Sequence, residues 1–188
     1  MAKSFFRNIY ENPIIAAIND EDKITKAIES PCRAVFLLIG DILNLDDRVK
    51  VLQKSNKLVY VHMDLMGGLS KDLAAMRFIN EQVKPDGIIT TKTSLVKAGR
   101  EAGIFTIQRL FILDSMALDS GIESIKRIRP DAVEILPGIM PKVVKRIHKE
   151  TRTPIITGGL IKDKEDVIGS LNSGAIAISS SNEKVWYM

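Results

Sequence analysis

Two glycines and two serines near the C-terminus have the properties of a phosphate-binding site. Gly158 and Gly159 end one apolar run, and Ser180 and Ser181 end the next run along the chain. Glycines let a ligand approach the backbone closely, and small polar residues before a helix leave N–H groups free beside a partial positive charge. We therefore expect these four residues to bind a phosphate group. A tight turn followed by a helix cap would explain the same residues without a ligand.

A histidine and a carboxylate end a third apolar run. His62 and Asp64 are two residues apart and share one face of a strand, where they could hydrogen-bond a polyol or bind a metal ion. They could equally satisfy each other as a buried pair. A site with several histidines is excluded, because the only other histidine, His148, lies in a predicted basic helix.

Two charged residues interrupt apolar runs, where an unpaired charge would be costly. Arg109 and Glu134 could pair across neighbouring strands, or they could orient a ligand, with the arginine offering a forked donor to phosphate or carboxylate. Lys92 follows another run and is a further candidate for ligand binding or for Schiff-base or acid chemistry, although a solvated lysine at a helix start is commoner. No nucleophile is paired with a base and no Gly-x-Ser-x-Gly elbow occurs. We therefore assign no catalytic residue.

The elements that carry these residues are short apolar runs, each followed by an amphipathic stretch. This alternation is the pattern of a (β/α)8 barrel, an α/β fold whose chemistry lies at the carboxyl ends of its parallel strands. Strands buried on both faces read as continuous apolar runs, as these do. We predict a single compact barrel domain over residues 1–188, with strands in residues 13–18, 34–40, 57–64, 87–91, 105–112, 132–137, 154–160 and 175–181.

The two ends of the chain complete the predicted barrel. Residues 4–11 carry apolar side chains at helical spacing, which predicts a short helix that covers the amino-terminal end of the barrel. Residues 182–188 allow about two helical turns at most, so the last helix is truncated. We expect another cover at that place, such as a neighbouring subunit, and hence a homo-oligomer.

The composition limits the classes of protein to which the chain can belong. No apolar stretch approaches the roughly 18 residues of a membrane span, and residues 1–7 lack the apolar segment of a signal peptide. Cys32 is the only cysteine, which excludes an intrachain disulfide and a cysteine-rich zinc site. We expect a cytoplasmic protein without membrane contact, metal or cofactor.

Positive charges gather on one predicted helix, although the net charge of the chain is only +4. Four basic residues of segment 140–152 lie on one helical face, and the preceding helix would add two more beside them. Such a patch is typical of nucleic-acid binding, whereas a solvated outer helix also carries a charged face. The candidate RNA-binding residues are Lys142, Lys145, Arg146, Lys149, Arg127 and Arg129.

Longer phrases occur together over nearly the whole chain: Val61-His62-Met63-Asp64-Leu65, Asp86-Gly87-Ile88-Ile89-Thr90-Thr91-Lys92, Gln108-Arg109-Leu110-Phe111, Leu113-Asp114-Ser115, Glu134-Ile135-Leu136-Pro137-Gly138 and Gly158-Gly159-Leu160-Ile161. In combination they resemble the glycerol-3-phosphate-responsive antiterminators, regulatory proteins of glycerol uptake operons in Gram-positive bacteria. The resemblance implies a regulator rather than an enzyme. It implies a protein that responds to glycerol 3-phosphate, binds leader messenger RNA and allows transcription to pass a terminator.

The resemblance also implies roles for the candidate residues. The two glycines and two serines near the C-terminus would hold the phosphate of the effector, glycerol 3-phosphate. The glycerol portion would be surrounded by His62, Asp64, Arg109 and Glu134. The resemblance identifies no RNA-binding residue, so the basic helical face remains a hypothesis from charge alone.

A phosphosugar epimerase or isomerase is the alternative. His62-x-Asp64-x-Met66-Gly67 is similar to a stretch of ribulose-phosphate 3-epimerases, which are small barrels that use a metal and two acidic residues. The chain departs from that pattern, because Gly67 stands where an Asp is expected and a further histidine is missing. A barrel that binds a metabolite without touching RNA is a third possibility.

Overall fold

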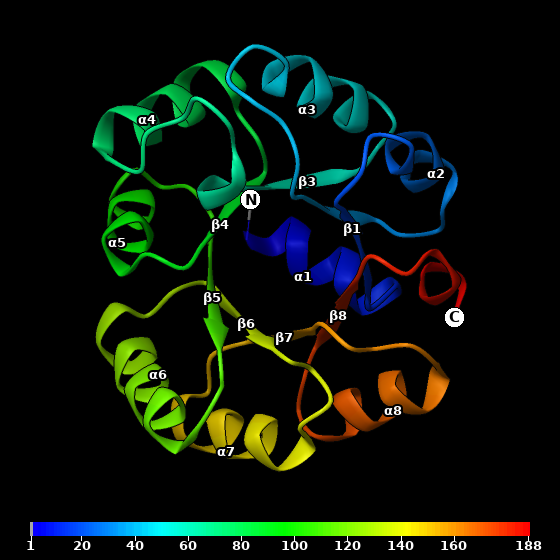
Figure 1. Cartoon of the computed structure of the whole chain (residues 1–188), viewed down its shortest axis with the longest axis vertical. Helices are drawn as coiled ribbons and strands as arrows, with labels where there is room; N and C mark the ends of the chain where they lie inside the picture. The colour runs from blue at the N-terminus through cyan, green and yellow to red at the C-terminus, as the bar shows by residue number, and fades with distance from the viewer. Residues whose placement is uncertain (1) are drawn as a thin grey trace.

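The computed structural model describes residues 2–188, with side chains from Phe5 onward, and contains a closed barrel of parallel strands (Figure 1). The strands follow one another around the barrel in sequence order, and β8 pairs with β1 to close it. Each strand lies within one of the predicted apolar runs, which confirms the (β/α)8 barrel. Their bounds are β1 Ile14–Ile18, β2 Ala34–Leu37, β3 Leu58–His62, β4 Gly87–Thr90, β5 Thr106–Phe111, β6 Ala132–Leu136, β7 Ile155–Gly158 and β8 Ala177–Ser180.

Helices form a ring outside the strands (Figure 1). They are α2 Lys23–Glu29, α3 Leu45–Lys54, α4 Leu73–Phe78, α5 Thr93–Glu101, α6 Ser115–Ile128, α7 Pro141–Thr151 and α8 Lys164–Asn172. Shorter helical turns are η1 Met63–Leu65 and η2 Ile79–Val83, the latter continuing α4 as a π-helix. Among the described residues, no helix combines the length and apolar character that a membrane crossing requires.

Aspartates start several of these helices. The carboxylates of Asp72 and Asp163 each accept a hydrogen bond from the backbone N–H three residues later, at 2.9 and 3.0 Å. Such a bond satisfies one of the N–H groups that the first helical turn leaves without a partner. Gly174 follows α8 with a φ of +105°, a conformation that side chains disfavour, and thereby ends the helix.

Both faces of each strand are buried, because the barrel is filled inside and covered outside. In β2, Ala34 and Phe36 belong to the cluster that fills the barrel, whereas Val35 and Leu37 pack between sheet and helices. This double burial explains why the strands appear in the sequence as continuous apolar runs.

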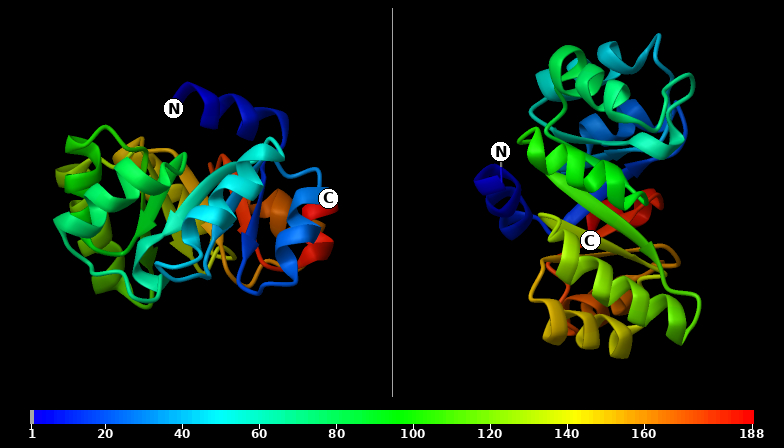
Figure 2. Two further views of the ribbon diagram at one scale, coloured as in Figure 1. Left: turned by 90° about the horizontal axis from the view of Figure 1, so that it is seen from above. Right: turned by 90° about the vertical axis from the view of Figure 1, so that its left-hand side faces the viewer.

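The N-terminal helix closes one end of the barrel. Helix α1 (Ala2–Glu11) lies across that end in the side views (Figure 2). Its Phe5 is fully buried, and the Phe5 ring lies 5.2 Å from the ring of Tyr60 and 4.9 Å from that of Phe105. This confirms the predicted cover and leaves the carboxyl ends of the strands as the open rim.

The truncated last helix is confirmed, but the chain itself supplies the cover. A single 3-10 turn, η3 (Glu183–Tyr187), packs beside β1 and β8. Trp186 is fully buried there, and its indole N–H donates to the carbonyl of Ser180 at 2.6 Å. One large aromatic side chain therefore fills the space that a longer helix would occupy. The homo-oligomer was expected because this place needed a cover. Since η3 covers it, the homo-oligomer stays a prediction without this argument.

Candidate functional site

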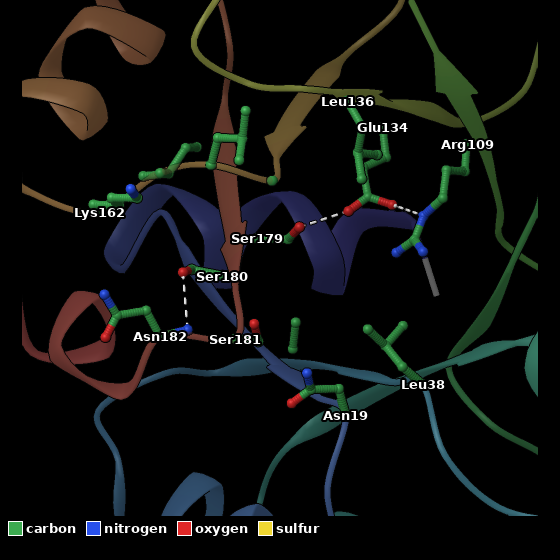
Figure 3. Close-up of a pocket in the computed structure, with 14 residues that line it drawn as sticks. Asn19, Leu38, Arg109, Glu134, Leu136, Lys162, Ser179, Ser180, Ser181 and Asn182 are labelled. Carbon is green, nitrogen blue, oxygen red and sulfur yellow. Dashed lines mark hydrogen bonds and ion pairs between the residues drawn. The ribbon is translucent and has the colours of Figure 1, made fainter.

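A cavity of about 390 Å³ opens at the carboxyl-terminal rim of the barrel (Figure 3). Strands β1, β5, β6 and β8 and the segments that follow β1, β2, β7 and β8 contribute to its wall. The lining residues are Ala17, Asn19, Leu38, Arg109, Glu134, Leu136, Gly159, Leu160, Ile161, Lys162, Ser179, Ser180, Ser181 and Asn182. The cavity thus brings together five of the predicted ligand-binding residues: Arg109, Glu134, Gly159, Ser180 and Ser181.

Four buried polar side chains point into the barrel at this end. They are His62, Arg109, Glu134 and Ser179, and in each case the residue two positions earlier in the strand belongs to the interior cluster. Alternate residues of a strand share one face, so these side chains form a polar layer directly above the apolar interior. A buried polar group needs a partner, which makes their contacts decisive.

Glu134 is the centre of a hydrogen-bonded network in this layer. Its two carboxylate oxygens accept from Arg109 Nε at 2.6 Å and from Ser179 Oγ at 2.5 Å. Arg109 and Glu134 are paired in register on β5 and β6, and the Glu134 side chain is fully buried. The structure therefore forms the predicted ion pair and places both residues in the cavity wall. Orientation of a ligand by this pair stays a prediction.

Arg109 retains donors for a ligand. Only its Nε forms a hydrogen bond within the described chain, and the terminal guanidinium nitrogens have no partner there. In Figure 3 these nitrogens lie below the Glu134 carboxylate, toward the space that the labelled residues surround. The carboxylate balances the arginine charge and holds the planar donor group in one orientation.

The loop after β7 offers backbone donors. Gly159 and Leu160 both have a left-handed backbone conformation, with φ of +73° and +63°. The N–H groups of Gly159, Leu160 and Ile161 donate no hydrogen bond within the described chain. A leucine in this conformation is strained by about 1 kcal/mol, and such strain is found preferentially where a loop binds a ligand.

Gly158 was predicted to bind phosphate together with Gly159, but it does not line the cavity. It lies behind the cavity wall rather than in it. A Cβ atom added at Gly158 would lie 2.5 Å from Ser179 Oγ and 2.9 Å from a carboxylate oxygen of Glu134. The residue is glycine because the Glu134 network occupies the space that any side chain would need.

The segment after β8 uses part of its hydrogen-bonding capacity internally. Ser180 Oγ accepts from the N–H of Asn182 at 3.1 Å, and the Asn182 side chain accepts from the N–H of Lys184 at 3.1 Å. The Ser181 hydroxyl, in contrast, forms no hydrogen bond within the described chain and lies at the cavity (Figure 3). Ser181 is therefore better placed than Ser180 to bind a ligand with its side chain.

Four polar lining residues lie outside the predicted set: Ser179 and Asn182, which flank the two predicted serines, and Asn19 and Lys162. Asn19 follows β1, and its Oδ1 accepts from Lys23 Nζ at 2.7 Å, which turns the amide nitrogen into a donor for a ligand. Lys162 follows the Gly158-Gly159 loop, is exposed, and forms no ion pair among the described residues. Reading the residue that closes the first apolar run would have found Asn19. The first cation after the paired glycines would have indicated Lys162.

His62 is buried beside this network without lining the cavity. Its side chain is 2% exposed, and its Nδ1 has no hydrogen-bond partner in the described structure. Burial, reinforced by the nearby charge of Arg109, lowers the pKa of His62 from 6.5 to about 4. His62 is consequently a neutral imidazole at neutral pH.

Asp64 and Lys92 lie outside the cavity lining. Asp64 accepts three hydrogen bonds, from Thr90 Oγ1 at 2.8 Å and from the N–H and hydroxyl of Thr91 at 2.7 and 2.9 Å. Burial acts to raise the pKa of Asp64, but these hydrogen bonds outweigh it and the pKa is lowered. Lys92 is exposed at the start of α5. Asp64 thus serves to join two loops, and it does not pair with His62.

The described residues contain no group of three or more His, Cys, Asp and Glu side chains placed to hold a metal ion. The metal-dependent epimerase chemistry considered for His62 and Asp64 therefore lacks its ligand set within this part of the chain.

The predicted basic patch is divided by acidic side chains. Arg146 on α7 pairs with Asp119 of α6 at 2.8 Å and with Glu150 at 2.9 Å, and Lys126 reaches the same Glu150 at 3.4 Å. The charge between α6 and α7 is therefore largely neutralised. Arg127 faces a different groove, between α5 and α6.

Comparison with known proteins identifies relatives over almost the whole chain. Residues 14–186 match the family model of the glycerol-3-phosphate responsive antiterminators. An uncharacterised Escherichia coli protein, YgcP, is 39% identical over 176 residues, which are 94% of this chain and 92% of that protein. Barrel aldolases, such as one at 15% identity with a TM-score of 0.71, share the fold alone.

Two solved structures from this group are close in both sequence and fold. The glycerol uptake operon antiterminator regulatory protein of Listeria monocytogenes is 35% identical, with a TM-score of 0.90 over 93% of this chain and 95% of that one. A glycerol uptake operon antiterminator-related protein of Thermotoga maritima is 38% identical, with a TM-score of 0.84 over 93% and 98%. The resemblance in sequence is thereby confirmed, and it indicates a regulator rather than an enzyme. The chain belongs to the family of glycerol-3-phosphate responsive antiterminators.

Proposed function

We propose that the chain senses glycerol 3-phosphate in the rim cavity and that the bound effector changes its affinity for leader messenger RNA. The observation that carries this proposal is the convergence on one cavity of an unpaired lysine, free backbone N–H groups and an oriented arginine. Its volume of about 390 Å³ falls in the range typical of small-molecule sites. A phosphate monoester of three carbons supplies the negative charge and the hydroxyls that such a wall would bind.

The charges of the wall favour one orientation of the effector. Arg109 is already balanced by Glu134, whereas Lys162 has no ion pair within the described chain. A dianion gains most from the cation that is not yet neutralised. The phosphate would therefore lie against Lys162 and the N–H groups of the loop after β7. The glycerol hydroxyls would then face Arg109, Asn19 and Ser181.

The response to the effector would pass through the loops that follow β7 and β8. A ligand shifts an equilibrium between two conformations only by its differential affinity for them. Glycerol 3-phosphate would favour the conformation in which the Gly159–Ile161 amides contact its phosphate and the Ser181 segment contacts its hydroxyls. An RNA-competent state that shares this loop conformation would then become more populated.

Isothermal titration calorimetry tests the first half of the proposal. We expect binding of glycerol 3-phosphate, with much weaker binding of glycerol or of inorganic phosphate alone, because each presents only part of the ligand. A ligand at 100 times its Kd should also stabilise the fold by about 2.7 kcal/mol. Absence of heat together with an unchanged melting temperature would refute a sensor at this cavity.

Binding of leader RNA with and without glycerol 3-phosphate tests the second half. Linkage requires that the effector and the RNA change each other's affinity by the same factor. We expect tighter RNA binding in the presence of the effector. Identical RNA affinity in both conditions would remove the proposed coupling while leaving the effector site intact.

A further inference from the structure

Helix α7 carries its positive charges on two sides that differ in pairing. On the side of α6, Arg146 is neutralised by Asp119 and Glu150. On the other side, Lys142 and Lys145 form no ion pair within the described chain. Both sides therefore carry basic residues, but only those on the side away from α6 lack an acidic partner within the described chain.

A groove of about 230 Å³ runs beside the unpaired lysines, between α7 and α8. Its walls are formed by Pro141, Lys142, Lys145, Gly169, Asn172 and Ser173. Lys142 and Lys145 are one turn apart, and Asn172 adds an exposed amide on the opposite wall. Glu165, one turn before Gly169 on α8, forms no ion pair with either lysine. The groove thus combines cations and a neutral hydrogen-bonding side chain.

Gly169 is the feature that the fold does not explain. It lies inside α8, where glycine is less favourable than alanine because it loses more backbone freedom. A Cβ atom at Gly169 would meet no atom within 4 Å beyond its chain neighbours and the backbone of its own helix, and its φ is not in the left-handed region. Neither packing nor backbone conformation requires a glycine here. Its absent side chain leaves the floor of the groove open to an external group.

The groove between α5 and α6 is a weaker candidate for an anion. Its volume is about 360 Å³, but Glu101 lines it and pairs with Lys97 at 3.9 Å. Arg100, also in its wall, donates to the carbonyl of Ile128 at 2.7 Å. Arg127 is the one cation in that wall with neither an ion pair nor a side-chain hydrogen bond among the described residues.

We infer that the groove between α7 and α8 binds the sugar-phosphate backbone of the RNA. This inference rests on the proposed RNA-binding function and gives it a surface. Phosphates lie against Lys142 and Lys145, Asn172 donates to a sugar or phosphate oxygen, and Gly169 allows the chain to approach the helix. The proposed surface does not include the neutralised side of α7, where the sequence also predicted an RNA contact, by Arg146.

Two double variants with equal loss of charge test the surface. Lys142→Ser with Lys145→Ser removes the unpaired lysines, and Lys126→Ser with Arg146→Ser removes two cations that are paired. Binding of a labelled glycerol-operon leader transcript is measured against salt concentration, with glycerol 3-phosphate present and with polyuridine as a second probe. Loss of two single-strand phosphate contacts should lower the salt slope by about 1.4 and the affinity at 0.1 M salt by about 25-fold. The paired control should keep the slope of the wild type.

A third variant tests the groove without changing charge. Gly169→Leu should fold at least as well as the wild type, since the added Cβ meets open space and leucine favours helices. It should nevertheless weaken RNA binding several-fold, whereas calorimetric binding of glycerol 3-phosphate stays unchanged.

The outcomes separate the surface from the function. If the wild type binds RNA and the lysine variant keeps its salt slope, or if both double variants lose affinity equally, the groove is not the contact surface. If the wild type binds neither transcript nor polyuridine with the effector present, the proposed RNA-binding function itself fails. A lysine-specific loss of slope together with weaker binding by Gly169→Leu supports the groove.

Discussion

Two regions of the barrel rim use similar residues with different results. The β3–β4 region holds a carboxylate, two threonines and a lysine, and the β5–β8 region holds a carboxylate, serines and a lysine. Asp64 is saturated by Thr90 and Thr91 and lies outside the lining of the rim cavity. Glu134 is also saturated, but it lies at the wall of a cavity of about 390 Å³ whose other donors are free.

The difference shows that residue type alone does not make a binding site. A ligand needs donors without an internal partner and a space beside them. In the β5–β8 region the carboxylate organises Arg109 and leaves its outer nitrogens available. In the β3–β4 region the hydrogen bonds of Asp64 join two loops, and its carboxylate oxygens are already used within the protein. Helix α7 repeats this contrast between its paired and unpaired sides.

The largest expected effect follows from removal of the carboxylate in each region. Glu134→Ala leaves the buried Arg109 charge without a partner, which should cost about 3–5 kcal/mol of folding stability and abolish effector binding. Asp64→Ala should cost less, about 1–3 kcal/mol, and leave effector binding intact. Chemical denaturation and calorimetry measure both quantities. Equal loss of binding in the two variants would contradict the contrast.

The folding stability should depend on pH through His62, the buried histidine between the two regions. His62 has a pKa of about 4 in the folded chain, against 6.5 when unfolded, so the unfolded chain binds the proton more tightly. Its contribution is fully present above pH 6.5 and is lost as the pH falls toward 4, by up to about 3 kcal/mol. His62→Gln should flatten stability against pH in this window. Asp64→Asn should alter the profile only below this window, because the lowered pKa of Asp64 lies below 3.8.

A methyl group tests how tightly the wall behind the cavity is packed. Gly158→Ala would push a carbon to 2.5 Å from Ser179 Oγ and disturb its bond to Glu134. We expect a loss of about 1–3 kcal/mol from overpacking, with weakened effector binding. Gly169→Ala is the matched control and should raise stability by about 0.5–1 kcal/mol, because its Cβ meets open space. Thermal denaturation of both would show whether the network tolerates displacement.

The smallest effect compares two exposed lysines of the rim. Lys162→Ala should weaken glycerol 3-phosphate binding about tenfold, or about 1.4 kcal/mol, through loss of one charge-assisted contact. Lys92→Ala should leave the affinity unchanged, because Lys92 lies outside the cavity lining. Folding stability should change little in either variant. A tenfold loss with Lys92→Ala would move the effector toward the β3–β4 region.

The sequence by itself determined the barrel, the order of its elements and the family. Continuous apolar runs and aspartate caps such as Asp72 reflect burial and backbone hydrogen bonding within short segments, so they can be read locally. The charges inside β5 and β6 also predicted that Arg109 and Glu134 matter, because a buried charge demands a partner wherever it lies.

Only the tertiary structure decided which candidates remain available to a ligand. Thr90 and Thr91 donate hydrogen bonds to Asp64, and Asn19 lines the cavity from the segment after β1. Trp186 covers the barrel where a second subunit was expected. Each of these facts depends on distances between groups that are remote in the chain. Periodicity along the sequence carries no information on those distances, because hydrogen bonds and ion pairs form only when the closed barrel brings both partners within about 3 Å.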